Sequence, residues 1–149
     1  MAEFDPNLNG CGWRAPELTL RRAKRSVPLL SAANAVISVL TGVCPTGVTR
    51  DRWVGFAATA ALAALMAEVI GAVRFCMAQE TPPEQQCRSI RRMLRWGALY
   101  HLLLMAVAAA AGVIACVRNF TGPLDLAAVA GMALSALCSY WTLRCTRSL

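Results

Sequence analysis

Two ionisable side chains, Glu68 and His101, lie inside long apolar stretches and are the residues best placed to do chemistry. Glu68 precedes Arg74 by six residues, and His101 follows Arg95 by six residues. At about 1.5 Å of helical rise per residue, each lies roughly 9 Å from its flanking arginine. Because an ionised group inside a membrane is costly, this matched pair is a candidate for proton or ligand binding. The alternatives are a structural hydrogen bond between helices, which we favour, or a glutamate that reaches the membrane surface.

Two further polar residues lie at similar depth. Asn34 follows Arg25 by nine residues, and Ser139 precedes Arg144 by five. We therefore predict an intramembrane polar cluster, structural or proton-binding, of Asn34, Glu68, His101 and Ser139. Within it, we expect Glu68 and His101 to be within direct or one-water reach of each other, or Glu68 to bond a partner subunit through the same face.

Other chemistry finds little support in the sequence. The seven cysteines form no CxxC motif, and the single histidine cannot supply both axial ligands of a bis-histidine haem. No acid pair, nucleophile elbow or phosphate loop is present. We therefore expect no catalytic residues, no metal, no cofactor and no enzymatic activity.

The elements that must position the polar residues are four apolar runs, at 27–48, 53–73, 96–117 and 123–143. About 20 apolar residues of α-helix cross the roughly 30 Å hydrocarbon core of a bilayer. Hydrophobic residues make up 57% of the chain. The sequence predicts an all-α integral membrane protein, a four-transmembrane-helix antiparallel bundle in residues 27–143.

The net charge of +7 is distributed as expected for a membrane protein rather than a nucleic-acid-binding one. Twelve Lys and Arg residues lie in the segments before the first run, between the second and third runs, and after the fourth; three lie in the other two loops. This positive-inside pattern predicts that both termini face the cytoplasm or mitochondrial matrix. The expected inner-face basic anchors are Arg21, Arg22, Arg25, Arg91, Arg92 and Arg95. The expected location is the mitochondrial inner membrane, with the ER, the Golgi or another organelle as the alternative.

The flanking segments have their own signals. Residues 1–26 predict an irregular tail followed by a short basic helix at 17–25, along the headgroups before Pro28. Residues 79–86, which include Pro82 and Pro83, predict a loop, and 89–95 a helical lead-in to the third span. Residues 144–149 predict a short basic tail.

Small residues at helical spacing predict the faces on which the spans pack, because small side chains allow close approach of helices in lipid. Large residues such as Leu102, Leu103, Val69 and Leu137 should point largely away from these faces. Asp125 is expected to form an ion pair at the rim with Arg118, Arg50 or Arg52. The predicted packing residues are Gly42, Ala64, Gly112, Gly131 and Ser135.

The order of Arg25, Asn34 and Gly42, with Glu68 late in the second span, resembles the COPI-coat-associated Golgi tetraspans. Glu68 and the stretch Ala-Leu-Tyr-His-Leu-Leu-Leu at 98–104 are also similar to the small subunit of the NADPH-oxidase cytochrome b. That second resemblance implies a stabilising partner for a larger catalytic chain. Together the two resemblances cover only scattered positions in 25–104, and the chain lacks a long proline-rich cytoplasmic tail.

Three functions remain open. The first is a non-catalytic accessory subunit of a larger membrane complex, with the lipid bilayer and other membrane subunits as partners and no nucleic acid. The second is a small proton-coupled transporter that uses Glu68 and His101. The third is a trafficking or membrane-shaping tetraspan.

Overall fold

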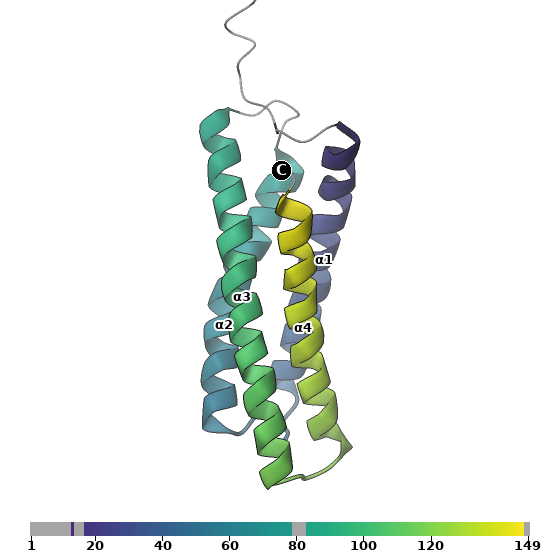
Figure 1. Cartoon of the computed structure of the whole chain (residues 1–149), viewed down its shortest axis with the longest axis vertical. Helices are drawn as coiled ribbons and strands as arrows, with labels where there is room; N and C mark the ends of the chain where they lie inside the picture. Colours follow the sequence, from purple (N-terminus) through teal and green to yellow (C-terminus); the bar gives the residue numbers. More distant parts are fainter. Residues whose placement is uncertain (1–12, 14–16, 79–82, 148–149) are drawn as a thin grey trace, which may run out of the picture.

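The computed structural model describes residues 13, 17–78 and 83–147, and in these residues it is all-helical. The helices are α1 (Glu17–Val43), α2 (Arg52–Met77), α3 (Glu84–Arg118) and α4 (Pro123–Arg147), which lie side by side along the long axis (Figure 1). Each is long and apolar enough to cross a membrane. The chain is thus suited to be a multi-pass membrane protein, and its apolar helices are compatible with contact with a bilayer.

Each helix packs against two others. Helix α2 lies against α3, α3 against α4, α4 against α1, and α1 against α2. Between α1 and α3, or α2 and α4, there is no comparable backbone contact in the described residues. The interior therefore receives side chains from all four helices, and a residue facing inward can meet partners from any of them.

Helix α1 differs from the sequence-based expectation at both ends. It is continuous from Glu17 to Val43, so residues 17–25 are not a separate helix, and Pro28 lies inside it. A proline leaves the carbonyl four residues earlier without its helical partner. The helix continues because Val27 and Ser31, on either side of Pro28, are both buried on the inward face. It ends at Val43 rather than at residue 48, since Cys44 precedes Pro45 and proline disfavours a helical residue before it.

The other helices also extend past the predicted boundaries. Helix α3 includes the lead-in at 89–95 and begins at Glu84, inside the expected loop, whose residues 79–82 lie outside the described part. Helix α4 continues to Arg147, so residues 144–147 are helical rather than a tail. Most of the expected N-terminal tail, residues 1–12, and the end of the C-terminal one, residues 148–149, also fall outside the description.

Basic side chains tie the helix ends together. Lys24 Nζ donates to the Ala78 carbonyl at the end of α2 (2.9 Å). Arg95 Nη2 donates to the Thr146 carbonyl (3.1 Å) and the Arg147 carbonyl (3.3 Å) at the end of α4. These carbonyls lack helical partners, and the negative end of the helix dipole favours cations there.

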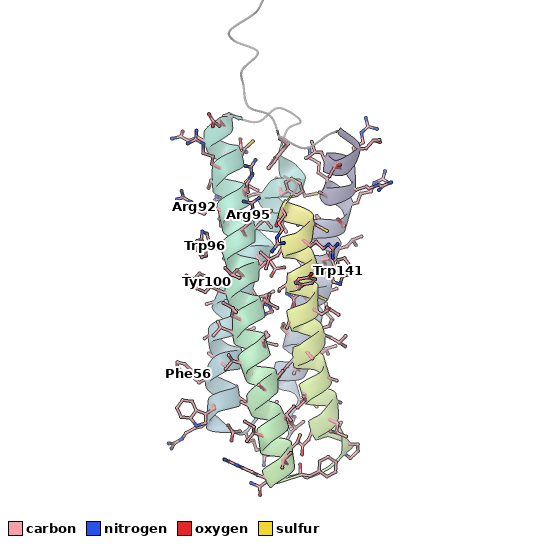
Figure 2. All side chains as sticks on the ribbon, in the orientation of Figure 1. Phe56, Arg92, Arg95, Trp96, Tyr100 and Trp141 are labelled. Atoms are coloured by element: carbon pink, nitrogen blue, oxygen red, sulfur yellow. The ribbon has the colours of Figure 1, made fainter. Side chains whose placement is uncertain are left out.

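The predicted basic anchors lie on this same end of the molecule. All are exposed except Arg91, which is half-buried. Figure 2 places Arg92 and Arg95 on α3, followed by Trp96 and Tyr100, whose rings stack at 5.6 Å. An aromatic pair next to arginines is typical of the membrane–water interface.

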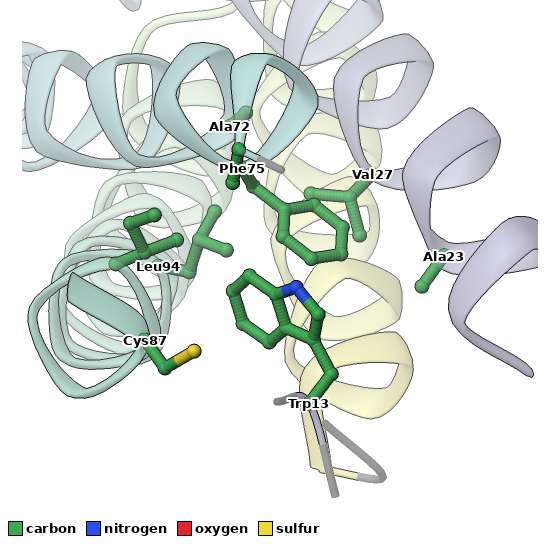
Figure 3. Close-up of a cluster of buried hydrophobic side chains, with 9 residues drawn as sticks. Trp13, Ala23, Val27, Ala72, Phe75, Cys87 and Leu94 are labelled. Atoms are coloured by element: carbon green, nitrogen blue, oxygen red, sulfur yellow. The ribbon is translucent and has the colours of Figure 1, made fainter. Parts of the chain in front are cut away.

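Two hydrophobic clusters fill the interior, one at each end. The first centres on Trp13, whose ring meets that of Phe75 edge to face at 4.8 Å, and includes Val27 and Leu94 (Figure 3). The second is built around Met105 and neighbouring residues of α2 and α4. The clusters occupy successive segments of α2 and α3, and the buried residues between them include the polar Glu68 and His101.

Candidate polar site between the helices

A layer of buried polar side chains lies between the two hydrophobic clusters, and Glu68 is at its centre. The carboxylate has no exposed surface. Its Oε1 accepts from Ser31 Oγ at 3.3 Å, and its Oε2 accepts from Ser139 Oγ at 3.0 Å and Asn34 Nδ2 at 3.4 Å. Every hydrogen bond shown to the carboxyl group in the described residues comes from a neutral donor. The acid is thus held by hydrogen bonds rather than by an ion pair.

His101 lies in the same layer and is also fully buried. Its Nδ1 is 2.8 Å from Ser139 Oγ and 3.2 Å from Asn34 Nδ2. Asn34 Nδ2 in turn donates to Ser139 Oγ at 2.8 Å. Glu68 and His101 are therefore joined through the hydroxyl of Ser139. We had expected them to meet directly or through one water molecule.

The structure thus brings together all four residues of the predicted cluster, one from each helix. It adds three serines that sequence reasoning did not assign to this cluster. Ser31 bonds Glu68, Ser135 donates to Asn34 Oδ1 at 2.5 Å, and the Ser38 and Ser135 hydroxyls are 2.9 Å apart. The sequence did carry a signal, because Ser31, Asn34 and Ser38 recur at helical spacing and so share one face of α1.

One side-chain atom of the layer has no hydrogen-bond partner among the described residues. This atom is His101 Nε2, which is buried. The residue also lines a cavity of about 240 Å³, whose walls are mostly from α1 and α2 and whose floor includes Met105 and Met132. From His101 the cavity extends past Ala58 to Thr49 and Gly55, at the end of the molecule opposite the basic anchors. Because buried polar atoms are normally paired, an unpaired nitrogen beside a cavity marks a candidate binding position.

The predicted packing residues fare differently from one another. A Cβ on Gly112 would lie 3.0 Å from Val129 Cγ2, and one on Gly131 would collide with Thr41 Oγ1, so both glycines lie at tight helix contacts. Ser135 belongs to the polar layer. A Cβ on Gly42 would meet nothing within 4 Å, because this residue lies on an exposed face of α1, so it makes no close helix contact within this chain.

Among the described glycines, Gly97 has the closest approach to the backbone of another helix, and this contact was not predicted. A Cβ there would lie 2.6 Å from the Glu68 backbone nitrogen and 3.1 Å from the carbonyl oxygen of Ala64. Ala64, a predicted packing residue, thus contributes through its backbone. Since only hydrogen fits at Gly97, this glycine sets the depth at which α2 places Glu68 against α3.

The large residues that we expected to point outward do so in part. Leu103 and Leu137 are exposed, at 53% and 49%. Val69 is only partly buried, and Leu102 packs against the second hydrophobic cluster.

Within the part of the chain that the structure describes, Asp125 forms no rim ion pair, contrary to the sequence-based expectation. It is fully buried. Its carboxylate accepts from the backbone N–H of Val48 at 3.2 Å and from the N–H and hydroxyl of Thr121 at 2.8 and 2.7 Å. Backbone amides of the turn after α1 and of the segment before α4 thus replace the arginines as its partners.

Within residues 13, 17–78 and 83–147, no group of three or more His, Cys, Asp or Glu residues is arranged to hold a metal ion. Comparison with protein-family models, with curated proteins and with solved structures found no match.

Proposed function

We propose that this chain is a non-catalytic accessory subunit of a larger membrane protein complex. In this proposal the four helices cross the bilayer as an antiparallel bundle with both termini on the cytoplasmic or matrix side. The uneven distribution of Lys and Arg supports that orientation. The mitochondrial inner membrane is the proposed host, with an ER or Golgi membrane as the alternative.

The main support for the proposal is that the polar side chains of the layer hydrogen-bond to one another. The layer's four central residues come from four different helices, and nearly all their hydrogen bonds are with one another or with adjacent serines. These residues are Asn34, Glu68, His101 and Ser139. Such a network fixes the helices in one arrangement, because a polar group in an apolar environment costs free energy when its partner is displaced. The layer therefore suits a chain whose task is to present a defined outer surface.

That outer surface is rich in large apolar side chains. Leu40, Phe56 and Val107 are among those that are more than half exposed. Lipid tails or the helices of a larger subunit would cover such residues equally well. The resemblance of Glu68 and the 98–104 stretch to the small subunit of the NADPH-oxidase cytochrome b favours a larger catalytic chain as the partner.

A proton-coupled transporter is the second candidate, because His101 has an unpaired nitrogen at a cavity. Transport requires access to the site from both sides of the membrane in turn. Here the other side of the polar layer is filled by the cluster around Trp13 and Phe75. This geometry fits binding from one side better than passage, so we rank it below the accessory role.

The test is purification of the tagged full-length chain in mild detergent, with measurement of its assembly size and of the stoichiometry of co-purifying chains. We expect it to migrate in a stoichiometric complex with at least one larger membrane chain. Migration as a lone small species would contradict the proposal.

Two variants of Glu68 sharpen this test. Glu68→Ala leaves the donors of Ser31, Asn34 and Ser139 without an acceptor, and should reduce the amount of complex recovered. Glu68→Gln retains the shape and one acceptor oxygen, and Ser31 can rotate to accept from the new amide group. We expect Glu68→Gln to assemble nearly as well as the wild type. In the transporter alternative, Glu68→Gln would abolish proton flux in liposomes while assembly stayed intact.

A further inference from the structure

The cavity beside His101 has the features of a water-filled access route. At about 240 Å³ it is large enough for several water molecules. Thr41, Thr49, Thr59 and Ser38 supply hydroxyl groups along its length, and His101 lies at its inner end. Ordered water needs two to four polar partners, which these hydroxyls and the unpaired Nε2 provide. Thr49 of the 44–51 turn also lines the cavity, so water that enters there would reach an imidazole nitrogen that is otherwise buried.

The hydrogen bonds of Ser139 couple the two ionisable residues. A serine hydroxyl has one hydrogen to donate and two lone pairs to accept with. Ser135 donates to Asn34 Oδ1, which fixes the orientation of the amide, so that Asn34 Nδ2 donates to Ser139 Oγ. One lone pair and one hydrogen remain, and they must serve His101 Nδ1 at 2.8 Å and Glu68 Oε2 at 3.0 Å.

Two arrangements satisfy the hydrogen bonds of Ser139, and the second also leaves His101 Nδ1 free to accept from Asn34 Nδ2, 3.2 Å away. If Ser139 donates to Glu68, it accepts from His101, which then carries its hydrogen on Nδ1 beside an ionised carboxylate. If Ser139 donates to His101, it accepts from Glu68, which is then protonated, and His101 carries its hydrogen on Nε2. The two arrangements differ by one proton. The tautomer of His101 is thus linked to the protonation state of Glu68.

We propose that Glu68 is a proton-binding site loaded from the 44–51 end of the molecule through His101 and Ser139. A proton from water in the cavity bonds to the Nε2 lone pair. The Nδ1 hydrogen moves to Ser139 Oγ as the Ser139 hydrogen moves to Glu68 Oε2. The layer gains one proton, no ring turns, and unloading follows the same steps in reverse. This role goes beyond the accessory function and does not depend on it.

Loading through the cavity is one-sided in this structure. On the other side of the layer, Val27, Phe75 and Leu94 pack together in the first hydrophobic cluster and are fully buried. In the described residues, the titratable groups near Glu68 are His101 of α3, which is joined to it through Ser139, and Cys138 of α4. Helix α1 presents only Ser31 and Asn34, which are neutral. A proton on Glu68 therefore exchanges most directly along the Ser139 route.

The experiment is time-resolved infrared spectroscopy of the purified full-length chain in lipid nanodiscs after a rapid change of pH. The carboxyl C=O stretch reports protonation, and Glu68→Gln identifies the band of Glu68. Ser139→Ala removes the relay hydroxyl. Ser31→Ala is the matched control, because it also removes a buried hydroxyl bonded to Glu68 but lies off the route to His101. Ala58→Leu narrows the cavity and leaves the polar layer intact.

We expect Ser139→Ala to slow protonation of Glu68 by roughly 100-fold, the usual effect of losing a positioned proton-transfer group. Ser31→Ala should remain close to the wild type. Ala58→Leu should also slow protonation, and this variant decides the matter if Ser139→Ala does not fold. Equal rates for Ser139→Ala and Ser31→Ala in folded protein would overturn the proposal. So would a wild-type rate in Ala58→Leu, or a Glu68 band that does not respond to pH.

Discussion

Replacement of Gly97 by alanine is the most direct probe of how the polar layer is positioned. The added methyl group would lie 2.6 Å from the backbone nitrogen of Glu68, 3.0 Å from its Cα and 3.1 Å from the carbonyl oxygen of Ala64. All three are backbone atoms of α2, so no side-chain rotation relieves the contact. To restore an ordinary separation of 3.4 Å, the two helices must move apart by about 0.8 Å at this point.

The magnitude follows from two opposing effects. Overpacking of a close contact costs about 1–3 kcal/mol. Alanine is favoured over glycine in a helix by about 1 kcal/mol, which offsets part of that cost. Displacement of α2 also stretches the bond between Ser139 and Glu68, which is already 3.0 Å long. We therefore expect Gly97→Ala to destabilise the chain by a net amount of about 1–2 kcal/mol.

The matched control is Gly42→Ala, also a glycine within a helix, where the new methyl group meets nothing within 4 Å. It should be neutral or slightly stabilising, because only helix propensity changes. Thermal unfolding of both variants in the same detergent, followed by circular dichroism, gives the comparison. A Gly97→Ala variant as stable as Gly42→Ala would refute the close contact between α2 and α3, and with it the placement of Glu68.

Three further variants probe the other packing features. Gly131→Leu should lower the thermal midpoint more than Leu137→Ala, because Gly131 touches α1 closely whereas Leu137 is 49% exposed; the opposite ranking would mean that the contact is misassigned. Asp125→Ala should lower the free energy of unfolding by about 1–3 kcal/mol, because the backbone N–H groups of Val48 and Thr121 lose their acceptor. An unchanged free energy of unfolding in chemical denaturation would argue against these hydrogen bonds. Trp13→Ala should cost about 3 kcal/mol by removing a buried ring, whereas Trp53→Ala, at a site 76% exposed, should cost far less; equal midpoints would place Trp13 outside the core.

The common level of the polar residues could be predicted because it follows from residue counts along each helix. Glu68 and His101 were assigned to one level because each is six residues from a flanking arginine, and helical rise converts that count into distance. Four apolar runs of sufficient length likewise predicted four helices. The observed helices differ from the predicted runs at their ends, where tertiary contacts extend them. The continuation of α1 through Pro28 depends on burial of Val27 and Ser31, which no local pattern shows.

The packing faces were harder to predict because the helices are apolar on nearly every side. On α2 the predicted packing residue was Ala64, whereas the buried positions include Ala57, Ala61 and Leu65. The two faces differ by a small rotation, and an all-apolar helix has little hydrophobic contrast with which to choose between them. Gly97 and the cavity were missed for a related reason. A close approach and a gap are both properties of two helices placed together.

The accessory-subunit proposal and the proton-binding proposal give Glu68 different roles, and substitutions of this side chain can separate them. The structural role needs only a hydrogen-bond acceptor of the right shape, which Glu68→Gln supplies. Proton loading needs an oxygen that gains and loses hydrogen, which an amide does not do in the ordinary pH range. If Glu68→Gln assembles but Ser139→Ala loads protons slowly, both duties belong to this layer. If Glu68→Gln fails to assemble while Glu68 in the wild type responds to pH, the protonation state itself controls assembly. The unpaired nitrogen of His101 would then make the complex sensitive to the aqueous phase at the 44–51 turn.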